Sequence, residues 1–393
     1  MAKVRLRTAS ITRRAVGHRL AAAFAFAVLF SVLLLTASDT GRGLLAVLCP
    51  VHLSFTHLPW WLTRTLYQKD GKPAYDADEL ARRWTSMRED APAAPSKNVT
   101  SICNEHSNVV SFNALVKRRM RVERRDEVAS LCDKAASRLV ALESGAQLVP
   151  VTYVGSDCDA LPNISSLPRA FALKATHLSG CGLLVRDGVV ATSLPGCGWL
   201  GRTLPYIVSD ALGVPRAGAP VTDNMLRRSC RRYMSLLHST EEWGYTRLTP
   251  RVIVEELLFL PNNQQLAEDV KCFVFQGRTE YIAHVRRRFG HGKSDTIFTR
   301  DGTNANVTLV GSQAELSEVR WEDAAPRPAL DDVVRQCDGI ARGLEFARVD
   351  LLYHQGGLSF GEVTLYPNGG RARWTQPDFD TTLGKLWCPK NKS

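Results

Sequence analysis

Two short apolar runs separated by a glycine turn, close to the C-terminal end of the chain, constrain its fold more than any other segment. The first run, FARVDLL, covers residues 346–352, and the second, LSFGE, covers residues 358–362. Two β-like runs around a glycine turn predict an antiparallel hairpin, which would bring Asp350 and Glu362 onto adjacent strands. Carboxylate oxygens are the ligands that hard cations prefer. With Arg348 beside them, these acids predict a site for magnesium and a nucleotide's phosphates.

The first 38 residues predict how the chain is targeted. Residues 1–19 carry six lysine and arginine residues and no acid, and residues 20–38 then run uncharged as LAAAFAFAVLFSVLLLTAS. That is close to the roughly 20 residues that span a bilayer, and basic residues ahead of it keep the N-terminal end in the cytoplasm. We therefore expect a single-pass type II membrane protein with a cytoplasmic tail (1–19), a transmembrane signal anchor (20–38), a stem or linker (39–100) and a luminal catalytic domain (101–390).

Two other interpretations of the leader stay open. Thr36-Ala37-Ser38 offers small residues at which a secretory signal peptide would be cleaved. An acid-free leader that contains arginine, serine and threonine also resembles an organelle transit peptide.

The secretory route is favoured by glycosylation sequons and cysteines. Asn98, Asn163, Asn306 and Asn391 each begin an Asn-x-Ser/Thr sequence. All ten cysteines lie beyond the apolar segment, which is typical of an oxidising lumen such as that of the endoplasmic reticulum or Golgi. Their spacing has no zinc-site pattern. We expect some to form disulfides and others to be free core thiols, among them Cys272 in an apolar strand.

The net charge of +11 does not indicate nucleic-acid binding, because the six cationic residues of the leader account for over half of it. The cluster at Arg227, Arg228, Arg231 and Arg232 lies in a helical-looking stretch and is typical of a solvated face. Arg286, which begins the run Arg286-Arg287-Arg288 after an apolar strand, is a better phosphate candidate.

Within residues 101–390, one segment has helical periodicity and several read as strands. Residues 126–144 place apolar side chains at spacings of three and four, which predicts one helix. Apolar runs and glycine turns predict further strands at residues 170–177, 183–186, 251–258, 271–275 and 279–285. Many strands with few intervening helices favour an α+β fold over a doubly wound sheet.

The blocks LPRAFALKATHLSGC, PRVIVEELL, EDVKCFVFQGRTEYI, ARVDLL and FGEVTLYPNGG, in this order, resemble the TupA-like ATP-grasp family of teichuronopeptide-biosynthesis type. The resemblance runs from about residue 131 to 386. It implies two α+β lobes that clasp ATP and Mg²⁺, and the activation of a carboxylate as an acyl phosphate that an amine then attacks.

The resemblance also implies roles for residues in the first lobe. Lys174 matches a lysine that contacts the nucleotide's phosphates, and His177, Ser179 and Gly180 match a flexible loop that covers them. The family's loop tends to His-Gly-Ser-Gly, and this chain departs from it with Leu178.

Further residues match the segments that border the nucleotide. Glu255, Glu256 and Leu257 match the segment beside the adenine, and only one of the two adjacent glutamates can face the site; we favour Glu255. Asp269 and Lys271 share one strand face, so that Asp269 would meet the ribose and Lys271 the phosphates or the substrate carboxylate.

The last blocks would supply the charge at the reacting phosphoryl group. Arg348 would stabilise the transferred charge, and Asp350 and Glu362 would hold magnesium. Thr364 stands where the wider superfamily commonly has asparagine, and its hydroxyl is a weaker magnesium ligand. Asn368 would bind substrate or serve as an ordinary turn residue.

Three functions therefore compete. The first is a membrane-anchored ATP-dependent ligase in polysaccharide or glycoconjugate biosynthesis, joining a carboxylate, such as a uronic acid of a glycan precursor, to a small amine or amino acid. The second is an ATP-dependent glycan phosphotransferase. The third is a non-catalytic glycan-binding protein.

Overall fold

The computed structural model describes residues 103, 111–195, 215–236, 241–261, 265–287, 293–312, 320–323 and 327–389. All of these belong to a compact unit that spans residues 55–393. The predicted tail, membrane anchor and stem lie outside the described residues. Within the described residues, no helix is both long and apolar enough to cross a membrane.

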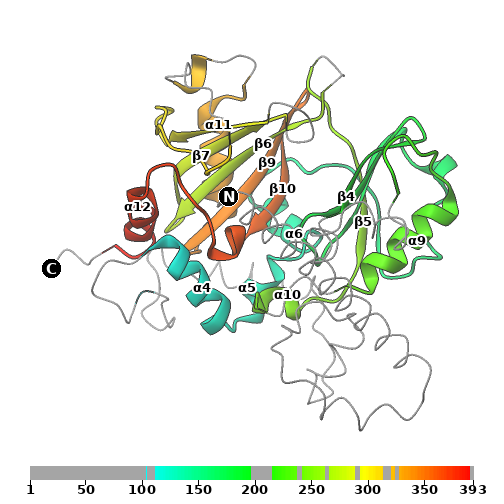
Figure 1. Ribbon diagram of the computed structural model, residues 1–393, viewed down its shortest axis with the longest axis horizontal. Coiled ribbons are helices and arrows are strands. Elements are labelled where there is room, and N and C mark those ends of the chain that lie inside the picture. The colour runs from blue at the N-terminus through cyan, green and yellow to red at the C-terminus, as the bar shows by residue number, and fades with distance from the viewer. Residues whose placement is uncertain are drawn as a thin grey trace, which may run out of the picture. The chain divides into compact units, whose positions relative to one another are not determined.

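The first of two sheets has five antiparallel strands in the order β1-β5-β2-β3-β4. The predicted hairpin near residue 170 is confirmed as β2 and β3, and the strand near residue 251 as β5. Helix α9 (Asp223–Met234) packs against β2 and β5, and Figure 1 shows it beside β5 in the green part of the ribbon. The strands of this sheet are β1 (Val151–Gly155), β2 (Ala170–Ala175), β3 (Cys181–Arg186), β4 (Val189–Pro195) and β5 (Val252–Glu256).

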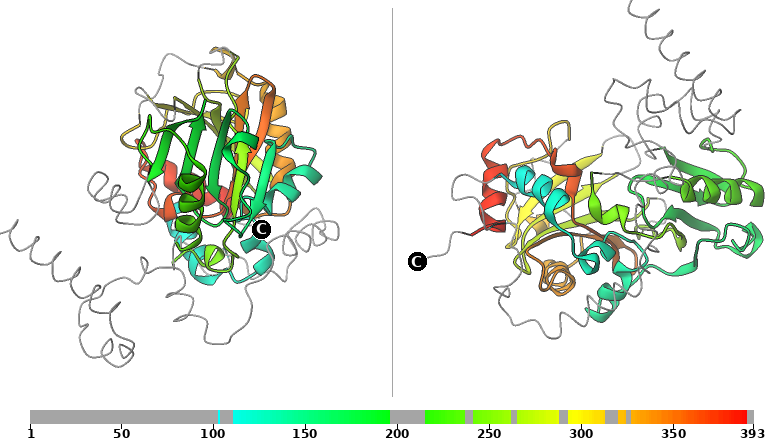
Figure 2. Two further views of the ribbon diagram at one scale, coloured as in Figure 1. Left: turned by 90° about the vertical axis from the view of Figure 1, so that its right-hand side faces the viewer. Right: turned by 90° about the horizontal axis from the view of Figure 1, so that it is seen from below.

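The second sheet is also antiparallel, in the order β10-β9-β6-β7-β8. Both hairpins predicted in this part of the chain are confirmed, and so is the α+β class. Figure 2 shows the two sheets as separate layers of strands. The strands are β6 (Glu268–Phe275), β7 (Arg278–Arg286), β8 (Ser294–Thr299), β9 (Phe346–His354) and β10 (Gly357–Thr364).

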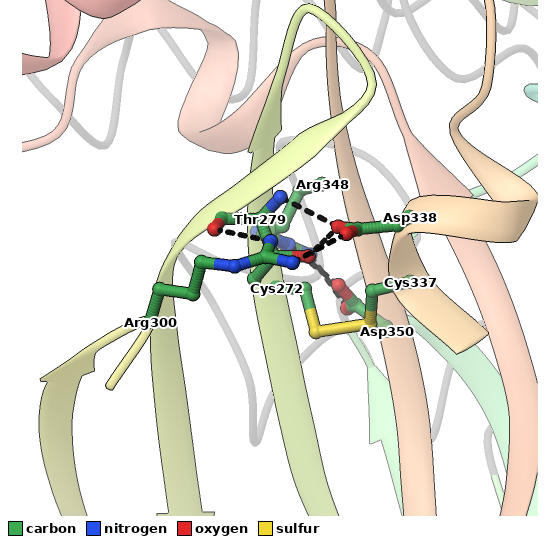
Figure 3. The surroundings of a disulfide bond; sticks show 7 residues. All are labelled: Cys272, Thr279, Arg300, Cys337, Asp338, Arg348 and Asp350. Atoms are coloured by element: carbon green, nitrogen blue, oxygen red, sulfur yellow. Dashed lines mark hydrogen bonds and ion pairs between the residues drawn. A yellow bond between two sulfur atoms is a disulfide. The ribbon is translucent and has the colours of Figure 1, made fainter. Parts of the chain in front are cut away.

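One face of the second sheet is covered by α11 (Leu330–Ile340). The alternation of β6 decides which face this is, because Val270, Cys272 and Val274 are fully buried while Lys271 between them points the other way. Cys272 forms a disulfide with Cys337 of α11, as Figure 3 shows. The prediction of a free Cys272 thiol was therefore wrong: the apolar strand position was read correctly, but its partner comes from a helix 65 residues further along.

Two more helices pack against the end of the second sheet at which β9 begins with Phe346. Phe112 begins α4 (Phe112–Val122) and stands edge-on to Phe346, with ring centroids 5.0 Å apart. Phe346 stacks on Trp387 at the end of α12 (Asp378–Trp387). A second disulfide, Cys103–Cys388, follows α12. The remaining short elements are α10 (Trp243–Thr246), η2 (Ile164–Ser166), η3 (Trp321–Asp323) and η4 (Pro367–Gly370).

The helix predicted over residues 126–144 is broken into α5 (Asp126–Ser130) and α6 (Ser137–Glu143). The break has a local cause at Asp133. Its carboxylate accepts hydrogen bonds from the backbone N–H groups of Ala135 and Ala136, at 2.7 and 3.0 Å. Such local bonds compete with helical hydrogen bonding. The prediction of helix on both sides of Asp133 was therefore confirmed, and the prediction of one continuous helix was wrong.

Candidate active site

The position of Glu362 depends on a β-bulge. Phe360 pairs with Leu351, but the next paired residue on β10 is Glu362, which lies opposite Asp350. Gly361 is the extra residue, and a Cβ there would meet the Asp350 carbonyl oxygen at 2.9 Å. Because residues opposite each other in a ladder share a face, the bulge puts both predicted metal-binding acids on one face.

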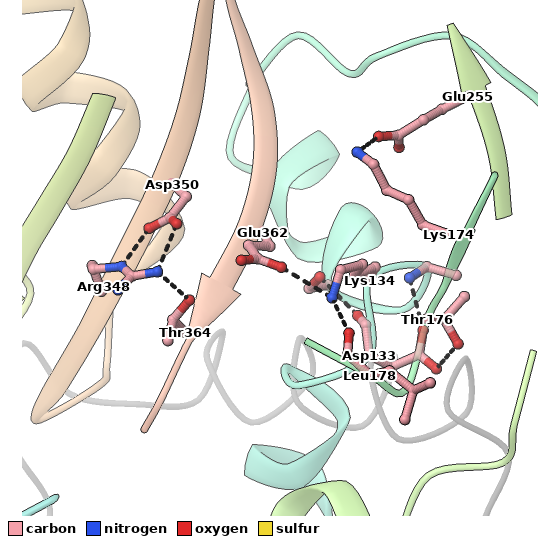
Figure 4. Close-up of polar contacts among 12 residues, drawn as sticks. Asp133, Lys134, Lys174, Thr176, Leu178, Glu255, Arg348, Asp350, Glu362 and Thr364 are labelled. Atoms are coloured by element: carbon pink, nitrogen blue, oxygen red, sulfur yellow. Dashed lines mark hydrogen bonds and ion pairs between the residues drawn. The ribbon is translucent and has the colours of Figure 1, made fainter. Parts of the chain in front are cut away.

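Asp350 lies at the centre of a buried charge network. Its carboxylate accepts from Arg348 Nε and Nη2 at 2.6 and 2.7 Å, and from Lys271 Nζ at 2.6 Å. Lys271 is also 3.3 Å from Asp269 Oδ2, as expected for residues on one strand face. Burial alone would lower the pKa of Arg348, but the Asp350 carboxylate outweighs it and the pKa stands above its ordinary value. Figure 4 shows the contact between Arg348 and Asp350, both on β9.

Thr364 belongs to the same network. Its hydroxyl accepts from Arg348 Nη2 at 3.0 Å, so the residue at the asparagine position of the wider superfamily helps to orient the arginine. The hydroxyl oxygen keeps a second lone pair, and its predicted role as a metal ligand remains a prediction.

Glu362 connects the second sheet to the loop that follows β2. Lys134 Nζ lies 3.0 Å from Glu362 Oε2 and donates to the Leu178 carbonyl oxygen at 2.7 Å (Figure 4). Burial opposes ionisation of Glu362, but the charges of Lys134, Lys271 and Arg348 outweigh it and hold its pKa well below the ordinary range. No role was assigned to Lys134 from sequence. No local pattern in residues 126–144 singles it out, because polar residues recur throughout that stretch.

Lys174 and Glu255 form an ion pair between β2 and β5 (Figure 4). Arg138 Nη1 lies 3.6 Å from the other oxygen of Glu255. Glu255 is buried and Glu256 is exposed, as expected for adjacent strand residues, and the buried one is the glutamate that we favoured. The backbone N–H groups of Glu256 and Leu257 donate to the Pro150 and Ala170 carbonyls.

The predicted phosphate loop has one buried and one open end. His177 is buried, with Nε2 3.2 Å from the Leu236 carbonyl oxygen, and burial lowers its pKa to about 4. Leu178 is also buried. Gly180 has a φ of 72° and lines the cavity described below, next to Ser179. Gly180, and not the His177 side chain, is therefore the part of this loop that lines the cavity.

A cavity of about 470 Å³ lies between this loop and the second sheet. Gly180 comes to it from the loop between β2 and β3 and Leu194 from β4, and Asp269, Lys271 and Arg348 come from the second sheet. Asn368, held at a φ of 53°, also lines it. The structure thus brings these predicted residues into one space. Asp350 adjoins it through Lys271, whereas Lys174 and Arg286 are not among the residues that line it.

The acids at this site offer the type of ligand atom that magnesium prefers, carboxylate oxygen. Within the described residues there is no cluster of three or more histidine, cysteine, aspartate or glutamate side chains arranged for a metal ion. Asp350 and Glu362 nevertheless present hard carboxylate oxygens on one face, as Mg²⁺ requires when the rest of its shell is water and phosphate. Since both Asp350 oxygens are engaged by Arg348 and Lys271, a cation there must share or replace those partners.

Comparison with known families supports the resemblance stated from the motifs. A family model described as TupA-like ATPgrasp matches residues 212–388. The match covers Glu255 to Thr364 and leaves residues 131–211, with Lys174 and the phosphate loop, outside it. Together with two antiparallel sheets, it supports an ATP-grasp fold. No curated protein matches the chain by sequence.

Several solved structures are similar to parts of the chain. One, the ATP-grasp ligase PsnB with its minimal precursor, is 11% identical over 65% of this chain and 59% of its own, with a TM-score of 0.32. Another, D-alanine–D-alanine ligase from Bacillus anthracis with ATP, is 15% identical over 61% and 57%, with a TM-score of 0.33. A third, N5-carboxyaminoimidazole synthetase from Staphylococcus aureus, is 11% identical over 60% and 44%, with a TM-score of 0.29. This chain therefore spans less than two thirds of each.

Proposed function

We propose that this chain, whose residues 212–388 match the TupA-like ATP-grasp family, is an ATP-dependent carboxylate–amine ligase. The observation that carries the proposal is the Lys271–Asp350–Arg348 network beside the cavity, with Glu362 on the same face. Two cations and two carboxylates on one face match the needs of phosphoryl transfer, in which protein cations and metal ions meet the charge on the transferred group.

The chemistry assigns a task to each residue. A substrate carboxylate oxygen attacks the γ-phosphorus of ATP and ADP leaves, and an amine then attacks the acyl carbon and expels phosphate. Arg348 and Lys271 would stabilise the transferred phosphoryl group, while Lys174, held by Glu255, would reach the nucleotide's phosphates. Asp350 and Glu362 would hold Mg²⁺, which when bound neutralises phosphate charge.

We propose that the protein acts in an oxidising lumen. Three disulfides link described cysteines: Cys103–Cys388, Cys158–Cys230 and Cys272–Cys337. Structural disulfides persist in secretory compartments and are rare in the cytosol, which supports the secretory route; the type II membrane topology rests on the leader sequence alone. A glycan carboxylate as substrate remains part of the proposal and rests on the family resemblance.

The test is a trapping experiment on the full-length protein. Incubation with Mg²⁺, ATP, hydroxylamine and a panel of carboxylates that includes uronic-acid glycans should yield ADP and a hydroxamate, because hydroxylamine intercepts an acyl phosphate. A stable phosphate ester would instead identify a phosphotransferase. ATP left intact with every carboxylate would contradict the ligase.

A further inference from the structure

Asn368 lines the cavity from the turn that follows β10. The chain leaves the second sheet at Thr364, which is paired with Arg348 on β9 and whose hydroxyl accepts from that arginine. Asn368 comes four residues later, so its Cα lies at most about 14 Å from that of Thr364, at about 3.5 Å per residue. Arg348 lines the cavity too, so the turn brings a carboxamide to the part of the cavity that holds this arginine.

The turn that carries Asn368 is fixed to α4 on its C-terminal side. Gly370 packs so closely that a Cβ on it would meet the Asn113 carbonyl oxygen at 2.7 Å. The Asn113 side chain donates to the Ala372 carbonyl oxygen at 2.8 Å and accepts from the Ala372 backbone N–H at 2.9 Å. On the N-terminal side stands Pro367, whose ring fixes its own φ. Asn368 is therefore held on a rigid support, as a residue that positions a reactant must be.

The side chain of Asn368 does not serve the turn itself. Asparagine side chains in turns commonly bond the backbone N–H two residues on, as Asn304 does when its Oδ1 accepts from Asn306 N at 2.8 Å. Among the described residues, the Asn368 carboxamide has no hydrogen-bond partner, and the residue is exposed. Its φ of 53° lies in the left-handed region, which glycine adopts without strain. The backbone would therefore accept glycine here, and the carboxamide is left for a ligand.

The carboxamide differs in kind from the other polar side chains of the cavity. Among the described residues that line it, Asn368 has the one neutral side chain that accepts hydrogen bonds. Lys271 and Arg348 are donors only, and Asp269 and Asp295 each have a lysine within 3.3 Å. A carboxylate would also favour the charged ammonium form of an amine, whose nitrogen has no lone pair for attack. A neutral amide oxygen accepts one N–H of an uncharged amine and leaves the lone pair available.

We propose that Asn368 binds the attacking amine through its side-chain oxygen and directs the nitrogen lone pair at the acyl carbon. The lone pair forms the C–N bond, phosphate leaves with the electron pair of the C–O bond, and the surplus amine proton passes to the departing phosphate. Arg348 and Lys271 hold the acyl phosphate during this step. The proposal rests on the proposed function and deepens it, because it gives the amine a place in the same cavity.

The test uses hydroxylamine as the amine, with the full-length protein, MgATP and the panel carboxylate that yields the most hydroxamate. Asn368→Gly keeps the left-handed backbone and removes only the carboxamide. It should lower kcat/KM for hydroxylamine about five- to tenfold, as expected when one hydrogen bond between neutral groups is lost, and should leave KM for ATP and for the carboxylate unchanged. The matched control is Asp187→Gly, at an exposed residue with a φ of 52° that is not among those lining the cavity, and it should behave like the wild type.

A second variant, Asn368→Asp, gives a readout that a purely structural role would not change. Aspartate also tolerates this backbone conformation, and its carboxylate favours the protonated amine. The rise of the hydroxamate rate with pH should therefore move to higher pH than in the wild type. Unchanged use of hydroxylamine by Asn368→Gly, a raised KM for the carboxylate in its place, or an unmoved pH profile in Asn368→Asp would overturn the proposal.

Isotope exchange within ATP distinguishes this inference from the proposed function. When no amine is present, reversible formation of the acyl phosphate moves a heavy oxygen isotope from the β,γ-bridge of ATP to the other oxygens of the β-phosphate. This exchange requires the carboxylate but not the amine, so it should persist in Asn368→Gly. Exchange in both proteins with equal use of hydroxylamine defeats this inference alone. Absence of exchange and of hydroxamate in the wild type defeats the proposed function.

Discussion

Glu362 lies directly opposite Asp350, one position away from where an unbroken β9–β10 ladder would put it. If the pairing of Phe360 with Leu351 continued regularly, Glu362 would face Val349, which is fully buried on the other side of the sheet. The extra residue, Gly361, re-aims the strand, as bulges near functional sites commonly do. The candidate metal site therefore depends on a backbone irregularity.

Gly361→Ala should damage both stability and catalysis. Its Cβ would meet the Asp350 carbonyl oxygen at 2.9 Å, so the two strands must separate, at a cost of about 1–3 kcal/mol. ATP turnover should fall at least about tenfold as Glu362 loses its alignment. Urea unfolding and ADP release measure the two effects. Gly339→Ala in α11, where the nearest atom is 3.6 Å away, is the matched control and should leave turnover intact. Native turnover in Gly361→Ala would show that the bulge is dispensable.

Arg348→Lys should abolish most turnover in a protein that still folds. The guanidinium donates to Asp350 through two nitrogens and to Thr364, and a single ammonium cannot reproduce this planar arrangement. We expect kcat for ADP release to fall about 100-fold, in the range seen when one preorganised donor is removed. The control is Arg335→Lys, at an exposed ion pair with Asp332. Turnover in Arg348→Lys equal to that of the control would contradict the role of the Arg348 guanidinium.

Acid should destabilise the fold through His177. Its pKa is lowered to about 4 by burial, against an ordinary value near 6.5. Between pH 6.5 and 4 the unfolded chain binds a proton at His177 that the folded protein does not. The free energy of unfolding is therefore at its full value above pH 6.5 and decreases as the pH is lowered below 6.5. The slope is about 1.4 kcal/mol per pH unit. His177→Gln should reduce the pH dependence of the unfolding free energy measured between pH 6.5 and 4. Burial also lowers the pKa of His284 and His354, so a smaller slope should persist. An identical slope in the variant would refute the assignment.

The Cys272–Cys337 disulfide should contribute about 2–4 kcal/mol to the free energy of unfolding, since it closes a long loop. The double variant Cys272→Ala/Cys337→Ala should show this loss in denaturant unfolding. Cys132→Ala, at a buried cysteine that is free, controls for the lost side-chain volume. Peptide mapping without reduction should recover Cys272 linked to Cys337. Recovery of an alkylated, unlinked Cys272 would contradict the pairing.

The hairpins of the fold follow from local sequence. Alternating apolar runs around Gln276-Gly277 and Gly356-Gly357 specify both partners and their turn, so β6–β7 and β9–β10 were predictable. The same local rule put Asp269 and Lys271 on one face. These residues are close in sequence or joined by a short turn, and few alternative pairings compete.

Contacts that depend on tertiary packing were not predictable. Lys134 reaches Glu362 across 228 positions of sequence, and no local pattern encodes that approach. The break at Asp133 was missed because the side chain, and not a glycine or proline, ends the helical run.

The most direct test of the account is a calorimetric titration of MgATP into the full-length protein and its Glu362→Gln variant. Among the residues that the structure describes, Glu362 forms one ion pair, with Lys134, and its own side chain is partly exposed, so the variant should fold normally. The wild type should bind ATP in a magnesium-dependent manner, Glu362→Gln should bind at least about tenfold more weakly, and Glu256→Gln, at the exposed neighbour of Glu255, should bind like the wild type. Absence of ATP binding by the wild type, or unchanged affinity in Glu362→Gln, would contradict the account.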